Sequence, residues 1–165
     1  MSPMPACHID ISLAEQRLRL MEKDAVTLDV AVSTAAKGPG EQWGSECTPR
    51  GWHVIRAKIG AGAAVNSVFV GRRPTGERYS PALARAWPGR DWILTRILWL
   101  SGLEVGRNRL GPVDTMRRYI YLHGSPDSVA MGVPGSRGCV RLRNADIVEL
   151  FDRVPAGTRV LIRET

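Results

Sequence analysis

The chain has 165 residues, of which 44% are apolar and 24% are charged, and this composition is typical of a folded globular protein. Its formal net charge of +7 and its pI of about 10.0 favour an anionic partner, namely nucleic acid, an acidic lipid surface or a polycarboxylate substrate. The alternative is that the charge only keeps the protein in solution. Because the arginines are spread along the chain and the few aromatic residues do not alternate with a basic run, nucleic-acid binding is not expected.

The N-terminal sequence MSPMPACHIDIS lacks a basic region followed by an apolar stretch, which a secretory signal requires. We therefore expect a cytoplasmic protein, or a periplasmic one if the start is truncated. The longest apolar-rich run, residues 92–103, is interrupted by Arg96 and falls short of the ~20 residues that span a bilayer. This run is expected in the core, with no membrane segment.

Strict alternation of apolar and polar residues predicts three half-buried strands near the start of the chain, at 9–12, 16–21 and 26–33. Residues 34–51 are rich in Gly, Pro and small polar residues and predict a long exposed loop. The sequence WHVIRAKIG then returns to a strand pattern.

The segment GAGAAV, residues 60–65, lacks the third glycine of a dinucleotide-binding loop and is predicted to be a flexible loop. A second Gly- and Pro-rich region covers residues 71–89. The tryptophans in and after it, Trp87, Trp92 and Trp99, are expected in the core. The sequence RYIYLHG then favours a strand that ends at His123.

The C-terminal segment carries the best-marked helix of the chain. Asn144 is expected to cap it, and Asp146 lies favourably in its first turn. Its apolar face comprises Ile147, Val148, Leu150 and Phe151, and Pro155 and Gly157 end it before a closing strand, TRVLI. Many strands with one convincing helix predict a mostly-β, α+β fold in a single domain, residues 1–165.

Metal binding is not expected. Cys7 and His8 are adjacent, and Cys47 lies six residues before His53, but no C-x-x-C or H-x-x-x-H spacing occurs. Both histidines are expected to be ordinary strand residues. Because three cysteines are an odd number and cytosolic thiols stay reduced, no obligatory disulfide is expected, although an oxidising compartment would permit a Cys7–Cys47 bridge.

Cys139 is the strongest candidate for a nucleophile. It follows Gly138 and stands between Arg137 and Arg141, and nearby positive charge lowers the pKa of a thiol. The alternative is a small apolar cysteine at the end of a strand. His123 is the candidate base, because a cysteine nucleophile needs a base within hydrogen-bond reach and the residues between them can form a returning loop. The backbone N–H groups of Gly138 and Cys139 are candidate oxyanion donors.

The segments IYLHGS and GVPGSRGCVRLRNADIVELFDRVPAGTRVLI resemble the signature of the YkuD-type L,D-transpeptidase catalytic domain family. That signature is an I-H-G-[ST] strand end followed by S-x-G-C-[IV]-R-[LM]-x-N-x-D. Upstream, IDISLAEQRLRLMEKDAVTLDVAVSTAAKG resembles the opening strands of the family, and TPRGWHVIRAKIG resembles its TPxGxF strand. The resemblance runs from about Ile9 to Ile162 and implies a β-sandwich-like domain with long Gly- and Pro-rich loops and one C-terminal helix.

The resemblance also implies roles for the residues of the signature. It makes Cys139 the nucleophile and His123 the base, with the backbone carbonyl of Gly124 orienting the imidazole. It places Ser136, Arg137 and Gly138 on the oxyanion side, and Arg141 on a substrate carboxylate or on the loop. The family often has histidine where this chain has Arg137, so altered electrostatics are expected there.

The implied substrates are peptidoglycan stem peptides or soluble muropeptides, cut between the L-centre of a diamino acid and a terminal D-alanine, with no metal or organic cofactor. If water accepts the acyl group, the enzyme is an L,D-carboxypeptidase, and if an amine accepts it, the enzyme forms cross-links. From the expected cytoplasmic location we predict that hydrolysis dominates and serves murein recycling. A non-enzymatic wall-peptide binder and a basic nucleic-acid-associated protein are the remaining alternatives.

Overall fold

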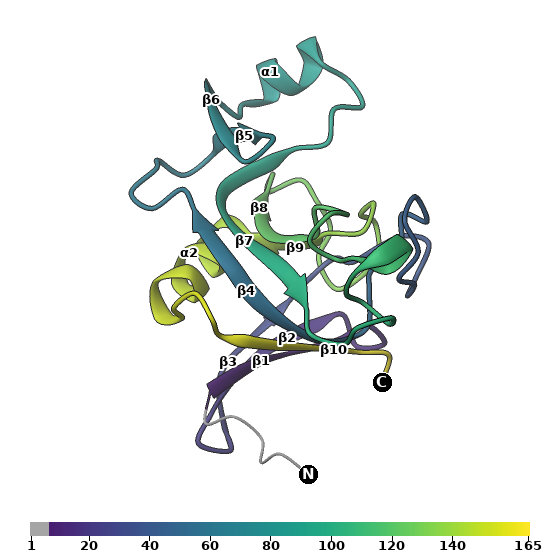
Figure 1. The fold of residues 1–165 in the computed structure, drawn as a ribbon. Helices are drawn as coiled ribbons and strands as arrows, with labels where there is room; N and C mark the ends of the chain where they lie inside the picture. Colours follow the sequence, from purple (N-terminus) through teal and green to yellow (C-terminus); the bar gives the residue numbers. More distant parts are fainter. Residues whose placement is uncertain (1–6) are drawn as a thin grey trace.

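The computed structural model describes residues 7–165 (Figure 1). Residues 1–6, on which part of the expectation about an export signal rests, lie outside them. The strands are β1 (Cys7–Ser12), β2 (Arg17–Glu22), β3 (Ala25–Ala31), β4 (Gly51–Ile59), β5 (Ser67–Val70), β6 (Arg73–Arg78), β7 (Ile93–Gly102), β8 (Tyr121–Ser125), β9 (Val140–Arg143) and β10 (Arg159–Arg163). The helices are α1 (Pro81–Ala86), the short 3-10 helix η1 (Gly111–Val113) and α2 (Asn144–Arg153).

The strands form one hydrogen-bonded sheet in the order β3-β2-β1-β10-β4-β7-β5-β6, with β8 paired to β7 and β9 paired to β8. Most neighbours are antiparallel, whereas β1 pairs with β10 and β8 pairs with β9 in parallel. The register of the second parallel pair sets His123 opposite Arg141. Cys139 directly precedes β9, so this pairing brings it back beside the histidine strand.

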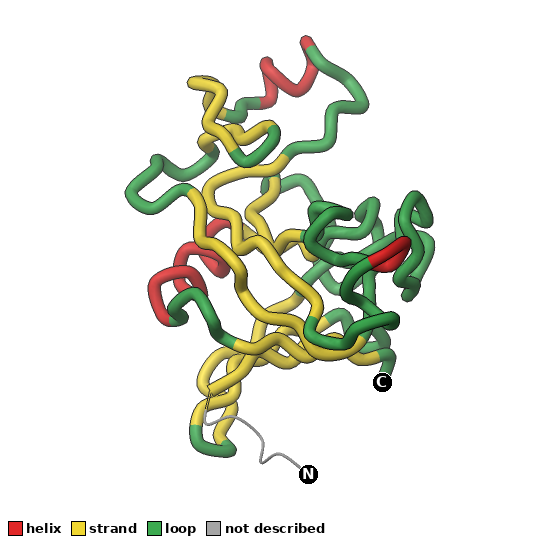
Figure 2. Tube along the Cα trace, in the orientation of Figure 1, coloured by secondary structure: helices red, strands yellow, loops and turns green. Residues whose placement is uncertain are grey.

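The sheet curls around one large apolar core (Figure 2). Leu20 of β2, near one end of the strand order, and Leu122 of β8, near the other, belong to the same buried cluster as Ile147 of α2. Helix α2 contacts β7, β8 and β9 and covers the core beside them. Each large apolar side chain in such a core contributes about 1.5–3 kcal/mol to the stability of the fold through burial. The core therefore stabilises the strands β8 and β9, which position His123 and Cys139.

The burial pattern of the strands follows from their sequences. In β2, Leu18 and Leu20 are buried, while Arg17 and Arg19 face outward and pair with Asp29 of β3 at 2.9 and 3.3 Å. Strand β7 is buried or half-buried at every position, including Thr95 and Arg96, so both of its faces are covered. The predicted mostly-β, α+β fold with one main helix is confirmed.

The start of α2 differs from the prediction that Asn144 caps it. The helix begins at Asn144, and Arg143 occupies the N-cap position without a side-chain hydrogen bond. The Asn144 amide is used elsewhere, because it bonds to Thr95 and Asn66 in the core. Asp146 does lie in the first turn, and the predicted apolar face is buried except for the half-buried Val148.

Other predictions about local structure need correction. Strand β8 runs from Tyr121 to Ser125 and does not end at His123. The region 71–89 contains β6 and α1, and the loop 34–51 is not exposed throughout, because Thr48 is fully buried. Trp87 is 58% exposed and Trp92 is half-buried, so the expectation of a core position is wrong for these two tryptophans. Trp99 is half-buried and packs against the smaller apolar cluster of Phe69, Ile97 and Tyr121. Burial depends on the tertiary position of each ring, which the local sequence does not encode.

His8 and His53 lie in β1 and β4 as expected, and both are buried. Residues 60–65 form the predicted loop between β4 and β5. Among residues 7–165, none of the helices is both long and apolar enough to cross a membrane.

Candidate active site

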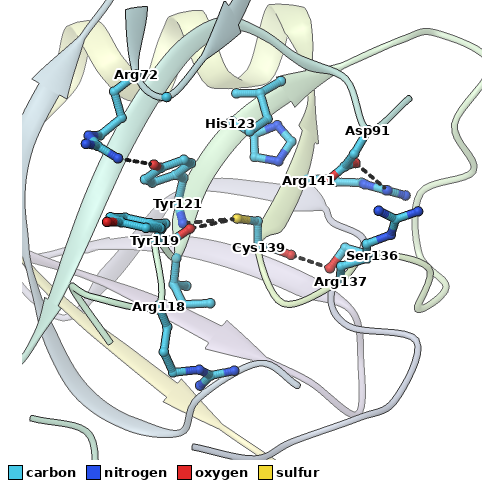
Figure 3. A pocket seen from close by; sticks show the side chains of 13 residues that line it. Arg72, Asp91, Arg118, Tyr119, Tyr121, His123, Ser136, Arg137, Cys139 and Arg141 are labelled. Atoms are coloured by element: carbon cyan, nitrogen blue, oxygen red, sulfur yellow. Dashed lines mark hydrogen bonds and ion pairs between the residues drawn. The ribbon is translucent and has the colours of Figure 1, made fainter. Parts of the chain in front are cut away.

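A pocket of about 440 Å³ opens where β8 and β9 lie side by side, and the two predicted catalytic residues, His123 and Cys139, line it (Figure 3). His123 comes from β8, and Cys139 comes from the turn before β9. The other side chains and backbone segments of the wall are Gly71, Arg72, Asp91, Ile93, Arg118, Tyr119, Ile120, Tyr121, Ser136, Arg137 and Arg141. The topology therefore joins two residues that are separated by 15 residues along the chain.

His123 is held in one orientation. Its Nδ1 lies 2.6 Å from the Gly124 carbonyl oxygen, and because a carbonyl only accepts, Nδ1 carries the proton of the neutral ring. The Nε2 lone pair is then available as a base. Burial lowers the pKa of His123, while the Gly124 carbonyl and Asp91 act in the opposite direction. The imidazole is therefore neutral near pH 7, as a general base must be.

Gly124 is fixed by a network of buried polar side chains. A Cβ at this position would overlap the Asn144 amide oxygen and the Leu94 carbonyl. The Thr95 hydroxyl donates to Asn144 Oδ1 at 2.7 Å, and Asn144 Nδ2 donates to Asn66 Oδ1 at 2.8 Å. The side chains of Asn144, Thr95 and Asn66 are called the asparagine–threonine brace below. This brace sets the position of the carbonyl that orients His123.

The Cys139 thiol has two hydrogen-bond partners on the neighbouring segment. The Tyr121 backbone N–H donates to Sγ at 3.3 Å, and the thiol donates to the Tyr119 carbonyl at 3.4 Å. Tyr119 has a left-handed φ of 55°, which directs its backbone toward the sulfur. The resting thiol is thus held on the Tyr119 side of the pocket.

The expectation that the thiol of Cys139 has a lowered pKa is wrong. Desolvation, helped by the charge of Asp91, raises the pKa of the thiol to about 12. The Tyr121 N–H and the charges of Arg141 and Arg118 act in the opposite direction and are outweighed. The thiol is therefore protonated at rest, and attack requires that a base remove its proton.

The turn before Cys139 is bonded internally. Ser136 Oγ donates to the Cys139 carbonyl, and the Gly138 N–H donates to Ser136 Oγ at 3.2 Å. Thr48 Oγ1 donates to the Gly138 carbonyl at 2.9 Å. Gly138 has a φ of 130°, which favours glycine. Without substrate the Gly138 N–H is bonded to Ser136, so the role of the Gly138 and Cys139 N–H groups as oxyanion donors stays a prediction. The contact of the Tyr121 N–H with the sulfur was not predicted from the sequence.

Arg141 is bonded within the protein. Its guanidinium donates to the Gly135 carbonyl at 3.1 Å and forms an ion pair with Asp91 at 3.1 Å. Of the two roles that the resemblance allowed, a substrate carboxylate or the loop, the geometry favours the loop. Arg137 is exposed at the rim of the pocket.

Several residues of the site were not found from the sequence. Arg118 clamps the loop 34–51 by donating to Gly40 O, Ser45 Oγ and Cys47 O at 3.2, 3.2 and 2.7 Å. Asp91 comes from a segment without a recognisable motif. For Arg72 a signal existed, because Gly71-Arg72 between two short apolar or basic stretches is typical of a two-residue hairpin turn.

Neither the cysteines nor the acidic residues form a metal site in the described part of the chain, where no cluster of three or more His, Cys, Asp or Glu side chains occurs. Cys7, Cys47 and Cys139 are all free thiols.

Comparisons with known proteins agree with one another. The family model for the YkuD L,D-transpeptidase catalytic domain matches residues 7–162. The chain is 35% identical over 102 residues to "Probable L,D-transpeptidase ErfK/SrfK" of Salmonella typhimurium, and the match covers 54% of this chain and 33% of that protein. The chain thus spans about a third of that relative.

Two solved structures share the fold. One is the L,D-transpeptidase, residues 123–326, from Xylanimonas cellulosilytica, with a TM-score of 0.55, 23% identity, and coverage of 99% of this chain and 65% of that one. The other is L,D-transpeptidase 3 from Mycobacterium tuberculosis in complex with a faropenem-derived adduct, with a TM-score of 0.59 and 15% identity. This match covers 97% of the chain and 61% of the mycobacterial one.

Proposed function

Because the chain belongs to the L,D-transpeptidase catalytic domain family, we propose that it is a cysteine acyl-transfer enzyme acting on peptidoglycan stem peptides. On this proposal it cleaves the bond between the L-centre of a diamino acid and a terminal D-alanine. The observation that carries the proposal is that Cys139 and an oriented, neutral His123 line one pocket. The arginines of that pocket fit a substrate with several carboxylates.

The reaction begins with a movement of the thiol. Cys139 turns from the Tyr119 carbonyl toward His123, whose Nε2 takes the thiol proton as Sγ attacks the substrate carbonyl. The tetrahedral intermediate collapses, the C–N bond breaks, and the imidazolium returns the proton to the amine of departing D-alanine. The remaining peptide is then held on Cys139 as a thioester. Hydrogen bonds between catalytic residues are often long in the substrate-free enzyme, and they commonly shorten once substrate binds.

For the second half of the reaction we propose water as the main acceptor, which makes the protein an L,D-carboxypeptidase. A pocket of about 440 Å³ lies at the small end of the range for ligand sites, roughly 300–1,000 Å³, and suits one peptide segment. Water, activated by His123, attacks the thioester, and the tripeptide leaves as the thiol is restored. Soluble muropeptides are the substrates that fit this outcome.

Transfer to an amine is the second candidate, and one observation favours it. A smaller pocket of about 190 Å³ adjoins the first and shares Asp91, Arg137 and Arg141 with it. A site that carries both signs of charge suits the ammonium and carboxylate groups of an amino-acid acceptor. The names of the relatives also support transpeptidation.

The proposal is tested by incubating the purified protein with a monomeric tetrapeptide. Intact-protein mass spectrometry is expected to show a peptide adduct on Cys139, and chromatography is expected to show tripeptide and D-alanine. Cys139→Ala removes both, and His123→Ala slows the reaction by about 10²–10⁴-fold. Turnover by Cys139→Ala above about a hundredth of wild type would refute the assignment.

The acceptor is tested separately by adding an excess of a free D-amino acid. Tripeptide remains the main product if water is the acceptor. Exchanged tetrapeptide or cross-linked dimer as the main product would show that an amine is the acceptor and would overturn the carboxypeptidase proposal.

A further inference from the structure

Four arginines line the pocket of Cys139, and their bonding partners differ. Arg118 donates to three groups of the loop 34–51, and Arg141 is bonded to Asp91 and Gly135. Arg137 stands exposed at the rim. Like Arg118, Arg72 has no carboxylate partner within residues 7–165. It differs from Arg118 because two aromatic rings and a single hydrogen bond hold it in place.

Arg72 reaches the pocket from the turn between β5 and β6. Gly71 and Arg72 have φ values of 56° and 66°, which is the geometry of a type I′ hairpin turn. The Arg72 Cζ lies 4.4 Å from the ring centroid of Trp99 and 4.8 Å from that of Tyr119. Both distances are within the range of a cation–π interaction. The aromatic rings therefore fix the guanidinium, while part of its hydrogen-bonding capacity is left over.

The partner of Arg72 on the pocket wall is Tyr121. Arg72 Nη1 donates to the Tyr121 hydroxyl at 2.9 Å (Figure 3). Burial raises the pKa of Tyr121, so the phenol keeps its proton. Because its oxygen already accepts from Arg72, the Tyr121 O–H is left to donate. The Arg72 guanidinium and the Tyr121 hydroxyl thus lie side by side, and each can donate a hydrogen bond to a bound ligand.

This pair of donors lies next to the nucleophile. The Tyr121 backbone N–H bonds to Cys139 Sγ at 3.3 Å. The Tyr121 hydroxyl is therefore no farther from the sulfur than the length of the tyrosine side chain allows. A group bound by Arg72 and Tyr121 would lie within the same substrate molecule that Cys139 attacks. Planar guanidinium groups recognise carboxylates through two parallel hydrogen bonds.

We propose that Arg72 and Tyr121 form a carboxylate-binding site that selects the substrate of Cys139. This inference rests on the proposed function and deepens it, since it names the group that the site recognises. Two groups of a stem peptide have this chemistry, namely the terminal carboxylate of D-alanine and the side-chain carboxylate of the diamino acid. Arg72 is then a specificity-determining residue supplied by the β5–β6 hairpin.

The experiment compares kcat/KM for three tetrapeptides: one with both carboxylates free, one with a C-terminal carboxamide and one with a side-chain carboxamide. Arg72→Met and Tyr121→Phe are measured beside wild type. Arg72→Met is expected to lower kcat/KM for the free peptide by about 10–100-fold, the usual effect of a charge-assisted hydrogen bond. Tyr121→Phe is expected to lower it by about 3–10-fold.

The amidated peptides identify the carboxylate. The peptide that lacks the recognised carboxylate is a poor substrate for wild type and loses nothing further in Arg72→Met, whereas the other amidated peptide behaves like the free one. Arg73→Met removes the same charge from the next residue, which is exposed and does not line the pocket, and serves as the matched control. It is expected to change kcat/KM less than about 2-fold for every peptide.

Two outcomes overturn the inference. One is an equal loss for all three peptides in Arg72→Met, which would mean that the side chain only supports the pocket wall. The other is a loss no larger than that of Arg73→Met. Either result, with a thioester still forming on wild-type Cys139, leaves the proposed function intact, whereas failure of the proposed function is seen as no thioester with any peptide.

Discussion

At the scale of single residues, the state of the Cys139 proton decides how the site works. In the sequence, the positive charges of Arg137 and Arg141 near Cys139 suggest a stable thiolate. Desolvation of the sulfur outweighs nearby positive charge and raises the pKa of the thiol to about 12. His123 has a pKa lowered by burial, so it is neutral and ready to accept a proton. The pair thus rests as thiol and imidazole, not as an ion pair.

This resting state predicts the pH dependence of alkylation by iodoacetamide. In a Cys7→Ser, Cys47→Ser background, the rate at Cys139 is expected to rise about tenfold per pH unit from pH 6 to pH 9 without a plateau, because the thiolate fraction grows by that factor below the pKa. The measurement is the rate of modification by mass spectrometry. A plateau near pH 6–7 would instead indicate a thiolate–imidazolium pair.

The sequence identified Cys139 and His123 because their neighbours form a recognisable signature. It could not supply Tyr121 as a second contact of the sulfur or Asp91 as the partner of Arg141. Those contacts depend on how β7 and β8 pair and on where the segment before β7 crosses the pocket. Charges counted along the sequence also omit desolvation, which is why the direction of the thiol pKa shift was predicted wrongly.

At the scale of secondary-structure elements, the asparagine–threonine brace links α2, β7 and the loop before β5 to the end of β8. Thr95 has a left-handed φ of 76°, a rare conformation for a β-branched residue, at the point where the β7–β8 register shifts. Its hydroxyl donates to Asn144 Oδ1 and accepts from the Asn66 N–H at 3.0 Å. The irregular backbone is thus stabilised by the same hydroxyl that positions Asn144.

Thr95→Val is therefore expected to destabilise the protein strongly for a change of nearly equal volume. The loss of the hydroxyl leaves buried groups of Asn144 and Asn66 without a partner, at a cost of about 2–3 kcal/mol. Thermal unfolding is expected to shift down by roughly 5–10 °C.

Thr95→Ser keeps the hydroxyl and is the control. It is expected to lose less than half as much stability as the valine variant, and it should retain most of the activity. If both variants unfold at the same temperature, the hydroxyl is not what stabilises this bend.

The same elements show why only part of the fold was predictable. Strands β1, β2 and β3 alternate regularly, and their positions were predicted to within about two residues. Strand β6 contains Pro74 and Gly76 and is mostly exposed, so it has neither the propensity nor the pattern of a strand. Its hairpin forms because β5 pairs with β7, a long-range contact that no local window contains.

At the scale of the whole molecule, long-range ion pairs join the loop next to the nucleophile turn to the end of the chain. Arg50 bonds to Glu41 at 2.9 Å and to Glu164 at 2.7 Å. The same loop bonds to the Cys139 turn through Thr48 and to the pocket-lining Arg118 through Cys47. The pocket is therefore supported by contacts that span nearly the full sequence, and such contacts follow from the curled sheet and not from any segment alone.

These pairs predict how stability depends on pH. Desolvation alone would raise the pKa of Glu41, but the hydrogen bonds and charge of Arg50 outweigh it and lower the pKa below its usual value. A carboxyl group with a depressed pKa in the folded state stabilises the protein above its unfolded pKa of about 4.3, and this contribution disappears as the pH falls through the folded value. Glu41→Gln removes the contribution.

Glu41→Gln is thus expected to lower stability by about 1 kcal/mol at pH 7, or roughly 2–4 °C in Tm. Between pH 4.3 and the folded pKa the difference from wild type should shrink, and below that pKa it should vanish, because wild-type Glu41 is then protonated and as neutral as glutamine. Glu46→Gln, in the same loop, removes an exposed pair with Lys37 that is 3.8 Å long and should change Tm by less than about 1 °C at any pH. A Glu41→Gln deficit that stays constant down to pH 3 would mean that packing of the Glu41 side chain, and not its charge, stabilises the loop around Arg50.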